Sequence, residues 1–142
     1  MTEPVVFPFI QANPEYHSSS LIPLVPLTLS HQGNRLSVEG MLDTGAAINV
    51  LPYSLGIEIG LRWEEQQHSI TLVGNLAQVP TKAVVLRATI AHFPPVDLAF
   101  AWAQTDQVRL LLGQMNFFQQ FNVCFFRSQS VFEIAPAQAE AQ

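Results

Sequence analysis

The tripeptide Asp-Thr-Gly at residues 43–45 constrains the fold of this chain more than any other sequence feature. The apolar residue Leu42 precedes it, and the strand-like apolar stretch 48–51 follows it. This pattern predicts a tight turn that joins two buried strands at the base of a sheet. Burying an unpaired carboxylate costs several kcal/mol. A fold that keeps Asp43 there must hold the side chain with hydrogen bonds, and it usually has a use for the acid.

The residues around Asp43 are small and suited to such a turn. Gly45 allows the backbone to turn sharply and to pass close to another segment. Thr44 places a hydroxyl group beside the acid, and Ala46 leaves room above it. The tripeptide alone is weak evidence, because it arises by chance in roughly a few per cent of chains of this length. On that simpler interpretation, Asp43 is a turn aspartate followed by a structural glycine.

A second apolar stretch ends in a glycine much later in the chain. Residues 108–113 read Val-Arg-Leu-Leu-Leu-Gly, and they are followed by a short helical stretch at 114–121. In that stretch Met115, Phe118 and Phe121 fall toward one side of the expected helix. The pattern predicts a buried strand, a glycine at its end and a short helix.

The remaining sequence alternates apolar and polar residues between turn signals, which is typical of β-structure. The expected elements are strands over 21–30 and 35–42, a short helix over 52–55, hairpin strands at 70–73 and 79–90 with a Gly-Asn tip, a strand over 96–102, and a closing hairpin over 123–134. Gly40 is expected at a bulge or a close backbone approach. Asp97 and Asp106, which lack a following glycine, are expected on a strand face and in a turn.

Together, Leu42-Asp43-Thr44-Gly45-Ala46 and Leu111-Leu112-Gly113 resemble the paired motifs of retropepsin-like aspartic proteases. The resemblance covers roughly residues 21–134. It implies an all-β fold: a small closed β-barrel with a flap hairpin and one short helix near its C-terminal end. It divides the chain into an N-terminal extended segment at 1–19, a retropepsin-like domain at 20–135 and a flexible tail at 136–142.

The same resemblance implies roles for particular residues. Asp43 corresponds to the catalytic acid, Thr44, Gly45 and Ala46 support its loop, and Leu111, Leu112 and Gly113 form the loop-packing motif. Val73, Gly74, Asn75, Leu76 and Ala77 form the flap that closes over a peptide substrate. Because the chain has a single Asp-Thr-Gly, the active form is expected to be a homodimer, with residues 1–12 or 123–134 at its interface. The family requires no metal or organic cofactor.

Composition agrees with a small domain that needs a partner. Of the 142 residues, 49% are hydrophobic and only 12% are charged, which predicts apolar surface beyond a single core. The net charge is −5 and the basic residues do not cluster into a stripe, so nucleic-acid binding is not expected. No apolar run approaches the roughly 20 residues of a membrane span, and the first residues, Met-Thr-Glu-Pro, contain no basic n-region. The cytoplasm is the expected compartment.

The single cysteine, Cys124, excludes an intrachain disulfide and a multi-cysteine zinc site. Its apolar neighbours predict a buried thiol. The four histidines are far apart and show no metal-ligand spacing. Residues 5–10 are too apolar for a solvated tail, and prolines at 4, 8 and 14 exclude a helix or a central strand there. Packing as an extended edge segment, on the domain or on a second subunit, is expected, with a pro-segment or self-cleavage site as the alternative.

The sequence therefore predicts an aspartic endopeptidase that acts on extended, mostly apolar peptides as a homodimer. Two alternatives stay open. The first is a non-catalytic dimeric module that binds peptides or assists assembly on the same fold. The second is a monomeric β-barrel binding domain in which the Asp-Thr-Gly arises by chance.

Overall fold

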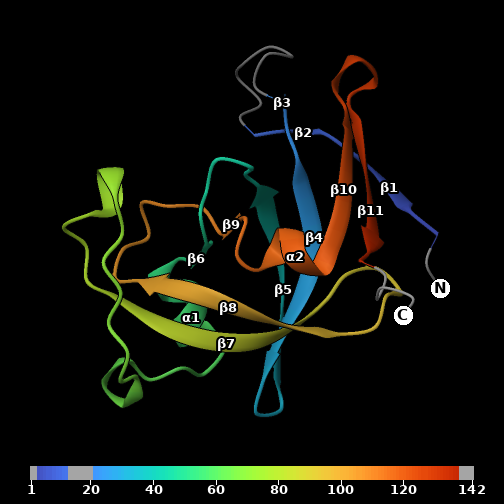
Figure 1. The fold of residues 1–142 in the computed structure, drawn as a ribbon. Helices are drawn as coiled ribbons and strands as arrows, with labels where there is room; N and C mark the ends of the chain where they lie inside the picture. Colours follow the sequence, from blue (N-terminus) through green and yellow to red (C-terminus); the bar gives the residue numbers. More distant parts are fainter. Residues whose placement is uncertain (1–2, 13–20, 138–142) are drawn as a thin grey trace, which may run out of the picture.

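The computed structural model describes residues 3–12 and 21–137, and this part of the chain consists mostly of strands (Figure 1). The strands are β1 Val5–Pro8, β2 Ile10–Gln11, β3 Leu21–Ile22, β4 Leu24–His31, β5 Asn34–Leu42, β6 Asn49–Leu51, β7 Thr81–Thr89, β8 Val96–Ala103, β9 Leu111–Leu112, β10 Phe121–Phe126 and β11 Val131–Pro136. The helical elements are α1 Tyr53–Glu58 and α2 Phe117–Gln120, with single 3₁₀ turns η2 Trp63–Glu65, η3 Gly74–Leu76 and η4 Arg127–Gln129.

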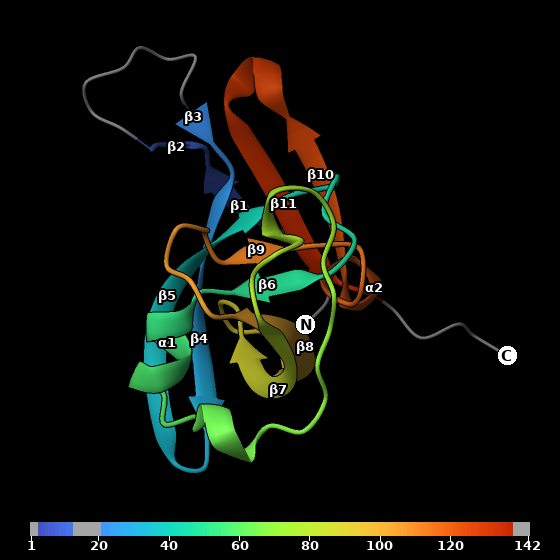
Figure 2. The same ribbon diagram turned by 90° about the vertical axis from the view of Figure 1, so that its left-hand side faces the viewer.

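Six of the described strands close into a barrel in the order β4-β5-β9-β6-β8-β7 (Figure 2). The barrel begins with the expected hairpin of β4 and β5, which pair from Leu24↔Met41 to His31↔Asn34. Gln32 and Gly33 at its tip have φ angles of 49° and 88°, the left-handed pair that two-residue hairpin turns require. The predicted all-β fold with a small closed barrel is confirmed.

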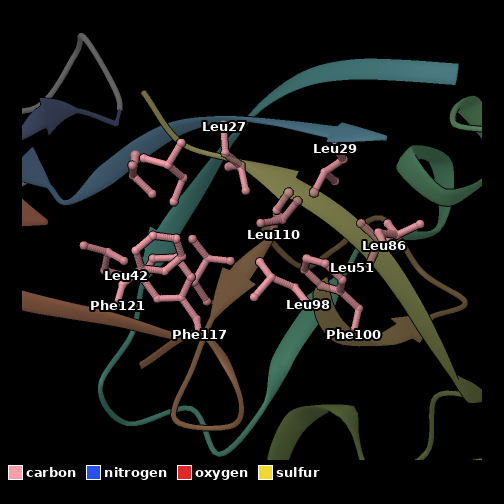
Figure 3. Packing of buried hydrophobic residues seen from close by; sticks show 14 of the residues in the cluster. Leu27, Leu29, Leu42, Leu51, Leu86, Leu98, Phe100, Leu110, Phe117 and Phe121 are labelled. Carbon is pink, nitrogen blue, oxygen red and sulfur yellow. The ribbon is translucent and has the colours of Figure 1, made fainter. Parts of the chain in front are cut away.

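The core fills the barrel with leucine and phenylalanine side chains from all of its strands, together with α2 and sheet neighbours (Figure 3). Gly40 lies at a close approach, as expected. A Cβ atom there would lie 2.7 Å from a methyl of Leu110 and 2.8 Å from one of Leu112. The absence of a side chain thus lets β5 pack directly against the segment that leads into β9.

The first helix, α1, begins after Pro52, in agreement with the sequence. It packs on β8 through Gly56, where an added Cβ would lie 2.3 Å from the Trp102 ring. The indole N–H of Trp102 donates to the carbonyl oxygen of Tyr53 at 3.1 Å. Trp63 packs edge-on against this ring at 5.1 Å between centroids.

The two ends of the described chain meet in a second sheet with the order β1-β11-β10. The N-terminal segment therefore packs as an edge strand, as predicted, with Val5 opposite Ile134 and Pro8 opposite Val131. The prediction that Cys124 is buried is wrong, because the thiol is exposed. Cys124 shares its face of β10 with the polar, exposed Asn122, which was the available signal, whereas the adjacent apolar Val123 and Phe125 lie on the other face.

The predicted strand over 70–73 does not form. Residues 69–80 run as an irregular segment that contains η3 and is joined to β7 by a single bridge, Ser69↔Lys82. Its backbone bonds to β7 are Ile70 N–H to Thr81 O at 2.9 Å and Ala83 N–H to His68 O at 2.8 Å. Gly74, with a φ of 72°, turns the chain into η3 in place of a two-residue hairpin tip. In the described residues, no helix is long and apolar enough to cross a membrane.

Candidate active site

Asp43 is the first residue after β5, where this strand runs parallel to β9. Its backbone N–H donates to Leu112 O at 3.0 Å, so β9 fixes the start of the loop. Its carboxylate Oδ1 accepts the backbone N–H of Gly45 at 2.9 Å, and its carbonyl oxygen accepts that of Ala46 at 3.1 Å. These bonds form an Asx turn that holds the acid from within its own loop.

The turn itself is less buried than the sequence suggested. Leu42 is buried and Asp43 is half-buried, whereas Thr44 and Gly45 are exposed. The expectation of a buried turn was therefore too strong for the single chain. The loop presents one side to the barrel and the other to solvent.

Gly113 lies directly beneath this loop. A Cβ atom at Gly113 would lie 2.7 Å from the carbonyl oxygens of both Ala46 and Ile48. On either side of this contact, the N–H groups of Gln114 and Met115 donate to Ala46 O and Ala47 O, each at 2.9 Å. Only a glycine allows the two backbones to touch here.

A buried asparagine, Asn49, locks this crossing from the side. Its Oδ1 accepts the N–H of Gly113 at 2.8 Å. Its Nδ2 donates to Ala99 O at 2.9 Å and to Asn116 Oδ1 at 3.1 Å. We did not single out Asn49 from the sequence. A polar residue between Ile48 and Val50, in a stretch expected to be wholly apolar, was the available signal.

A further support that the sequence did not reveal comes from Gln114. Its side-chain Nε2 donates to the carbonyl oxygen of Thr44 at 2.8 Å. This bond ties the exposed part of the loop to the segment after Gly113. The loop of Asp43 is therefore fixed by hydrogen bonds along most of its length.

A groove of about 240 Å³ separates this loop from the irregular segment 69–80. It is lined by Asp43, Gly45, Ala46, Ala47, Ile48, Val50, Leu72, Val73, Leu76 and Leu111. An apolar hollow of about 110 Å³ continues past Ile48, with Ile70, Ala83, Ala99, Phe100, Ala101 and Met115 as its other walls. The groove thus combines one carboxylate with an almost wholly apolar lining.

The structure brings together some of the residues predicted for the flap and not others. Val73 and Leu76 line the groove with Asp43, and Val73 is 88% exposed. Gly74, Asn75 and Ala77 do not line it. Leu72 joins the lining although it was not in the predicted set. The part of the segment 69–80 that lines the groove with Asp43 is therefore apolar.

A second groove of about 450 Å³ lies on the other side of Asp43. It is lined by Phe9, Pro23, Met41, Leu42, Asp43, Thr44, Phe125 and Arg127. The Arg127 guanidinium lies 5.4 Å from the Phe9 ring centroid and donates to Ser130 Oγ at 3.1 Å. This groove lies between the loop of Asp43 and the hairpin of β10 and β11.

The other two aspartates lie where the sequence predicted. Asp97 on β8 pairs with Arg87 at 3.4 Å, with both side chains exposed, and Asp106 accepts the N–H of Ser54 at 2.8 Å in a turn. Among the described residues that line the two grooves, Asp43 is the sole acid. No group of three or more His, Cys, Asp or Glu in the described ranges has the proximity to hold a metal ion.

Comparisons with known proteins identify the fold. No protein-family model matches the chain, and no curated protein matches it. Among solved structures, it is similar to a retropepsin-like aspartic protease from Rickettsia conorii, with a TM-score of 0.65 and 16% identity over 96% of this chain and 97% of that one.

It is also similar to the EIAV protease in complex with an inhibitor, with a TM-score of 0.50 and 20% identity over 70% of this chain and 88% of that one. At sequence identities of 16% and 20%, the structural similarity establishes the fold of this chain. This chain has the fold of the retropepsin-like aspartic proteases.

Proposed function

We propose that this protein is an aspartic endopeptidase, active as a homodimer that contributes one Asp43 from each chain. The observation that carries the proposal is the position of Asp43. It is a half-buried carboxylate in a loop fixed by hydrogen bonds, and it lies between an apolar groove and a second open groove. The retropepsin fold supports the same reaction class.

The chemistry requires two carboxylates that share one proton. The ionised carboxylate accepts a proton from a water molecule as the water oxygen bonds to the peptide carbonyl carbon. The protonated carboxyl donates its proton to the carbonyl oxygen. As the C–N bond of the tetrahedral intermediate breaks, the carboxyl that took the water proton gives it to the amine nitrogen, and a hydroxyl of the intermediate returns a proton to the other carboxylate. Because Asp43 is the sole acid lining the grooves of the described chain, a second copy must supply the other carboxylate.

The supporting residues have separate roles in this proposal. Gly45 donates its N–H to the Asp43 carboxylate, and Ala46 lines the groove. Thr44, which is exposed beside the acid, braces the two loops against each other across the dimer axis. Leu112 and Gly113 hold the loop from below, whereas Leu111 lines the groove.

The segment Val73–Ala77 acts as the flap that closes over substrate. Val73 and Leu76 offer apolar contacts in the groove, and Leu72 adds a third. A groove with this lining suits an extended peptide with aliphatic or aromatic side chains. Closure of the segment excludes bulk water from the reacting bond and leaves the attacking water molecule between the two carboxylates.

The test is cleavage of a mixed peptide library by the wild-type protein and by Asp43→Asn, followed by mass spectrometry from about pH 4 to 7.5. Asp43→Asn is expected to abolish cleavage, because an amide can neither accept the proton from water nor share one. Asp97→Asn is the matched control, since it removes an exposed acid from β8, and it is expected to keep full activity. Cleavage by Asp43→Asn would falsify the assignment of this residue.

A folded wild-type protein that binds peptides but cleaves none of them would favour the alternative function instead. In that case the chain is a dimeric peptide-binding or assembly module on the retropepsin fold, and Asp43 is a structural acid. A protein that stays monomeric and binds no peptide would favour the third possibility, a β-barrel binding domain.

A further inference from the structure

The strand β11 has no edge left for a partner chain, because both of its edges are occupied within the described chain. β1 pairs with one edge, from Val5↔Ile134 to Pro8↔Val131. β10 pairs with the other edge along its whole length, from Phe121↔Pro136 to Phe126↔Val131. Any strand from a second copy must therefore extend this sheet at the outer edge of β1 or of β10.

Backbone hydrogen bonds show which groups face each outer edge. The N–H of Phe9 donates to Ser130 O at 2.8 Å on the β1 side, and that of Ala137 donates to Gln120 O at 2.9 Å on the β10 side. Since backbone groups along a strand alternate in direction, even-numbered residues of β11 face β1 and odd-numbered ones face β10. The registers then direct the backbone groups of Val123 and Phe125 away from β11.

The same alternation leaves β1 a poor edge for pairing. Its outward residues are Val6 and Pro8, and proline has no N–H to donate. Prolines are a common protection of exposed edge strands. β10 has six residues, two outward N–H groups at Val123 and Phe125, no proline and no charged side chain. In the described chain, β10 is the unprotected edge of this sheet.

The position of β10 connects this edge to the candidate active site. Phe125 and Arg127 line the same groove as Asp43 and Thr44. The hairpin of β10 and β11 extends beyond the barrel in both views (Figures 1 and 2). A second copy that brings its Asp43 next to this one must therefore meet the hairpin. Phe125 and Phe126 are 40% and 39% exposed, so the strand also offers apolar surface.

We propose that β10 pairs antiparallel with β10 of a second copy, which makes a six-stranded sheet in the order β1-β11-β10-β10-β11-β1. The occupant is a copy of this chain because the proposed function, on which this inference rests, requires a second Asp43. A twofold axis perpendicular to a sheet relates antiparallel neighbours, so pairing of a strand with itself is the arrangement that the symmetry permits. The partner thereby covers the unprotected edge.

The first test removes one outward N–H group from each edge. Val123→Pro removes an outward backbone N–H from β10 and keeps the hydrogen bonds between β10 and β11. Val6→Pro removes the corresponding outward N–H from β1. Both are made in the Asp43→Asn background and measured by sedimentation over a range of concentrations. Val123→Pro is expected to raise the dimer dissociation constant by at least about tenfold, since the twofold axis doubles each lost hydrogen bond. Val6→Pro is expected to leave it unchanged.

A second pair of variants avoids any folding defect from proline. Cys124 is exposed on the outer face of β10. In the sheet, Glu133 on β11 lies between Cys124 on β10 and Val6 on β1, so the three residues are cross-strand neighbours. Cys124→Lys and Cys124→Glu are each expected to weaken the dimer by about tenfold, because like charges meet near the axis. An equimolar mixture of the two is expected to form a heterodimer of wild-type strength. Val6→Lys and Val6→Glu are expected to change nothing.

The outcomes separate this inference from the proposed function. A dimer that is indifferent to all Val123 and Cys124 variants, or a protein that is monomeric at every concentration, overturns the pairing through β10. A dimer that responds to these variants while wild-type protein cleaves no peptide supports the pairing and overturns the peptidase. If the wild-type protein cleaves peptides and only the Val6 variants change the dimer dissociation constant, the interface lies at β1 and the pairing through β10 is overturned.

Discussion

Asn49 is a fully buried polar residue, with 0% of its surface exposed, and its side chain bonds Gly113 at the crossing beneath Asp43 as well as Ala99 O and Asn116 Oδ1. We expect Asn49→Ala to lower the free energy of unfolding by about 2–4 kcal/mol, because it leaves the buried N–H of Gly113 without an acceptor. Chemical denaturation measures this loss. The exposed Asn75 supplies the control, since Asn75→Ala is expected to change stability by less than about 0.5 kcal/mol. Equal effects of the two substitutions would contradict the role of Asn49.

Gly113 is constrained by its neighbours and not by its backbone angles. An alanine there would place its Cβ 2.7 Å from two backbone oxygens, neither of which belongs to a flexible side chain. We expect Gly113→Ala to cost about 2 kcal/mol or more. Gly33→Ala is the informative comparison, because Gly33 has open space but a φ of 88°. That substitution is expected to cost only about 1 kcal/mol. A smaller loss at Gly113 than at Gly33 would argue against the close crossing.

At the scale of elements, the irregular segment 69–80 differs most from a regular hairpin. It is joined to β7 by one bridge, Ser69↔Lys82, with the two backbone bonds that flank it, and Leu72, Val73 and Leu76 line the Asp43 groove. Few backbone bonds restrain this segment, which is the property expected of a flap that opens and closes.

We expect Leu76→Ala to raise KM for a cleaved peptide about 3- to 10-fold with a smaller change in kcat. The substitution removes apolar surface that contacts the bound peptide. Val85→Ala is the control, because Val85 is 60% exposed on β7 and lines neither groove. Steady-state kinetics on one peptide measure both variants. A change confined to kcat would assign Leu76 a role other than substrate contact.

At the scale of the whole molecule, the proposed enzyme exists only as a pair. We therefore expect the specific activity to fall on dilution, and excess Asp43→Asn protein to inhibit the wild type. The reason is that heterodimers contain one aspartate and cannot share a proton between two. Specific activity that is independent of concentration and of added Asp43→Asn would refute a shared site.

Much of this fold could be predicted from the sequence, because its signals are local. The alternation of apolar residues gave β4, β5, β7 and β8 to within a few residues, and Pro52 marked the start of α1. The backbone crossing at Gly113 was implied by the resemblance of Leu111-Leu112-Gly113 to the retropepsin motif. A strand or a turn depends mainly on residues within a few positions of each other, so their order in the chain is enough to identify them.

What only the tertiary structure decided depends on contacts between distant residues. Cys124 shares its face of β10 with the polar Asn122 and the aromatic Phe126, so the local pattern is mixed, and only packing against the rest of the chain shows that this face is exposed. Asn49 became informative only when Gly113 and Asn116, more than sixty positions away, were seen beside it. The sequence by itself determined most of the long strands, with the predicted strand over 70–73 as the exception, and it identified the acid and the glycine beneath its loop. Packing decided which strand edges stay unpaired and which buried polar groups find hydrogen-bond partners. These pairings join residues that are far apart in the sequence, so no local pattern predicts them.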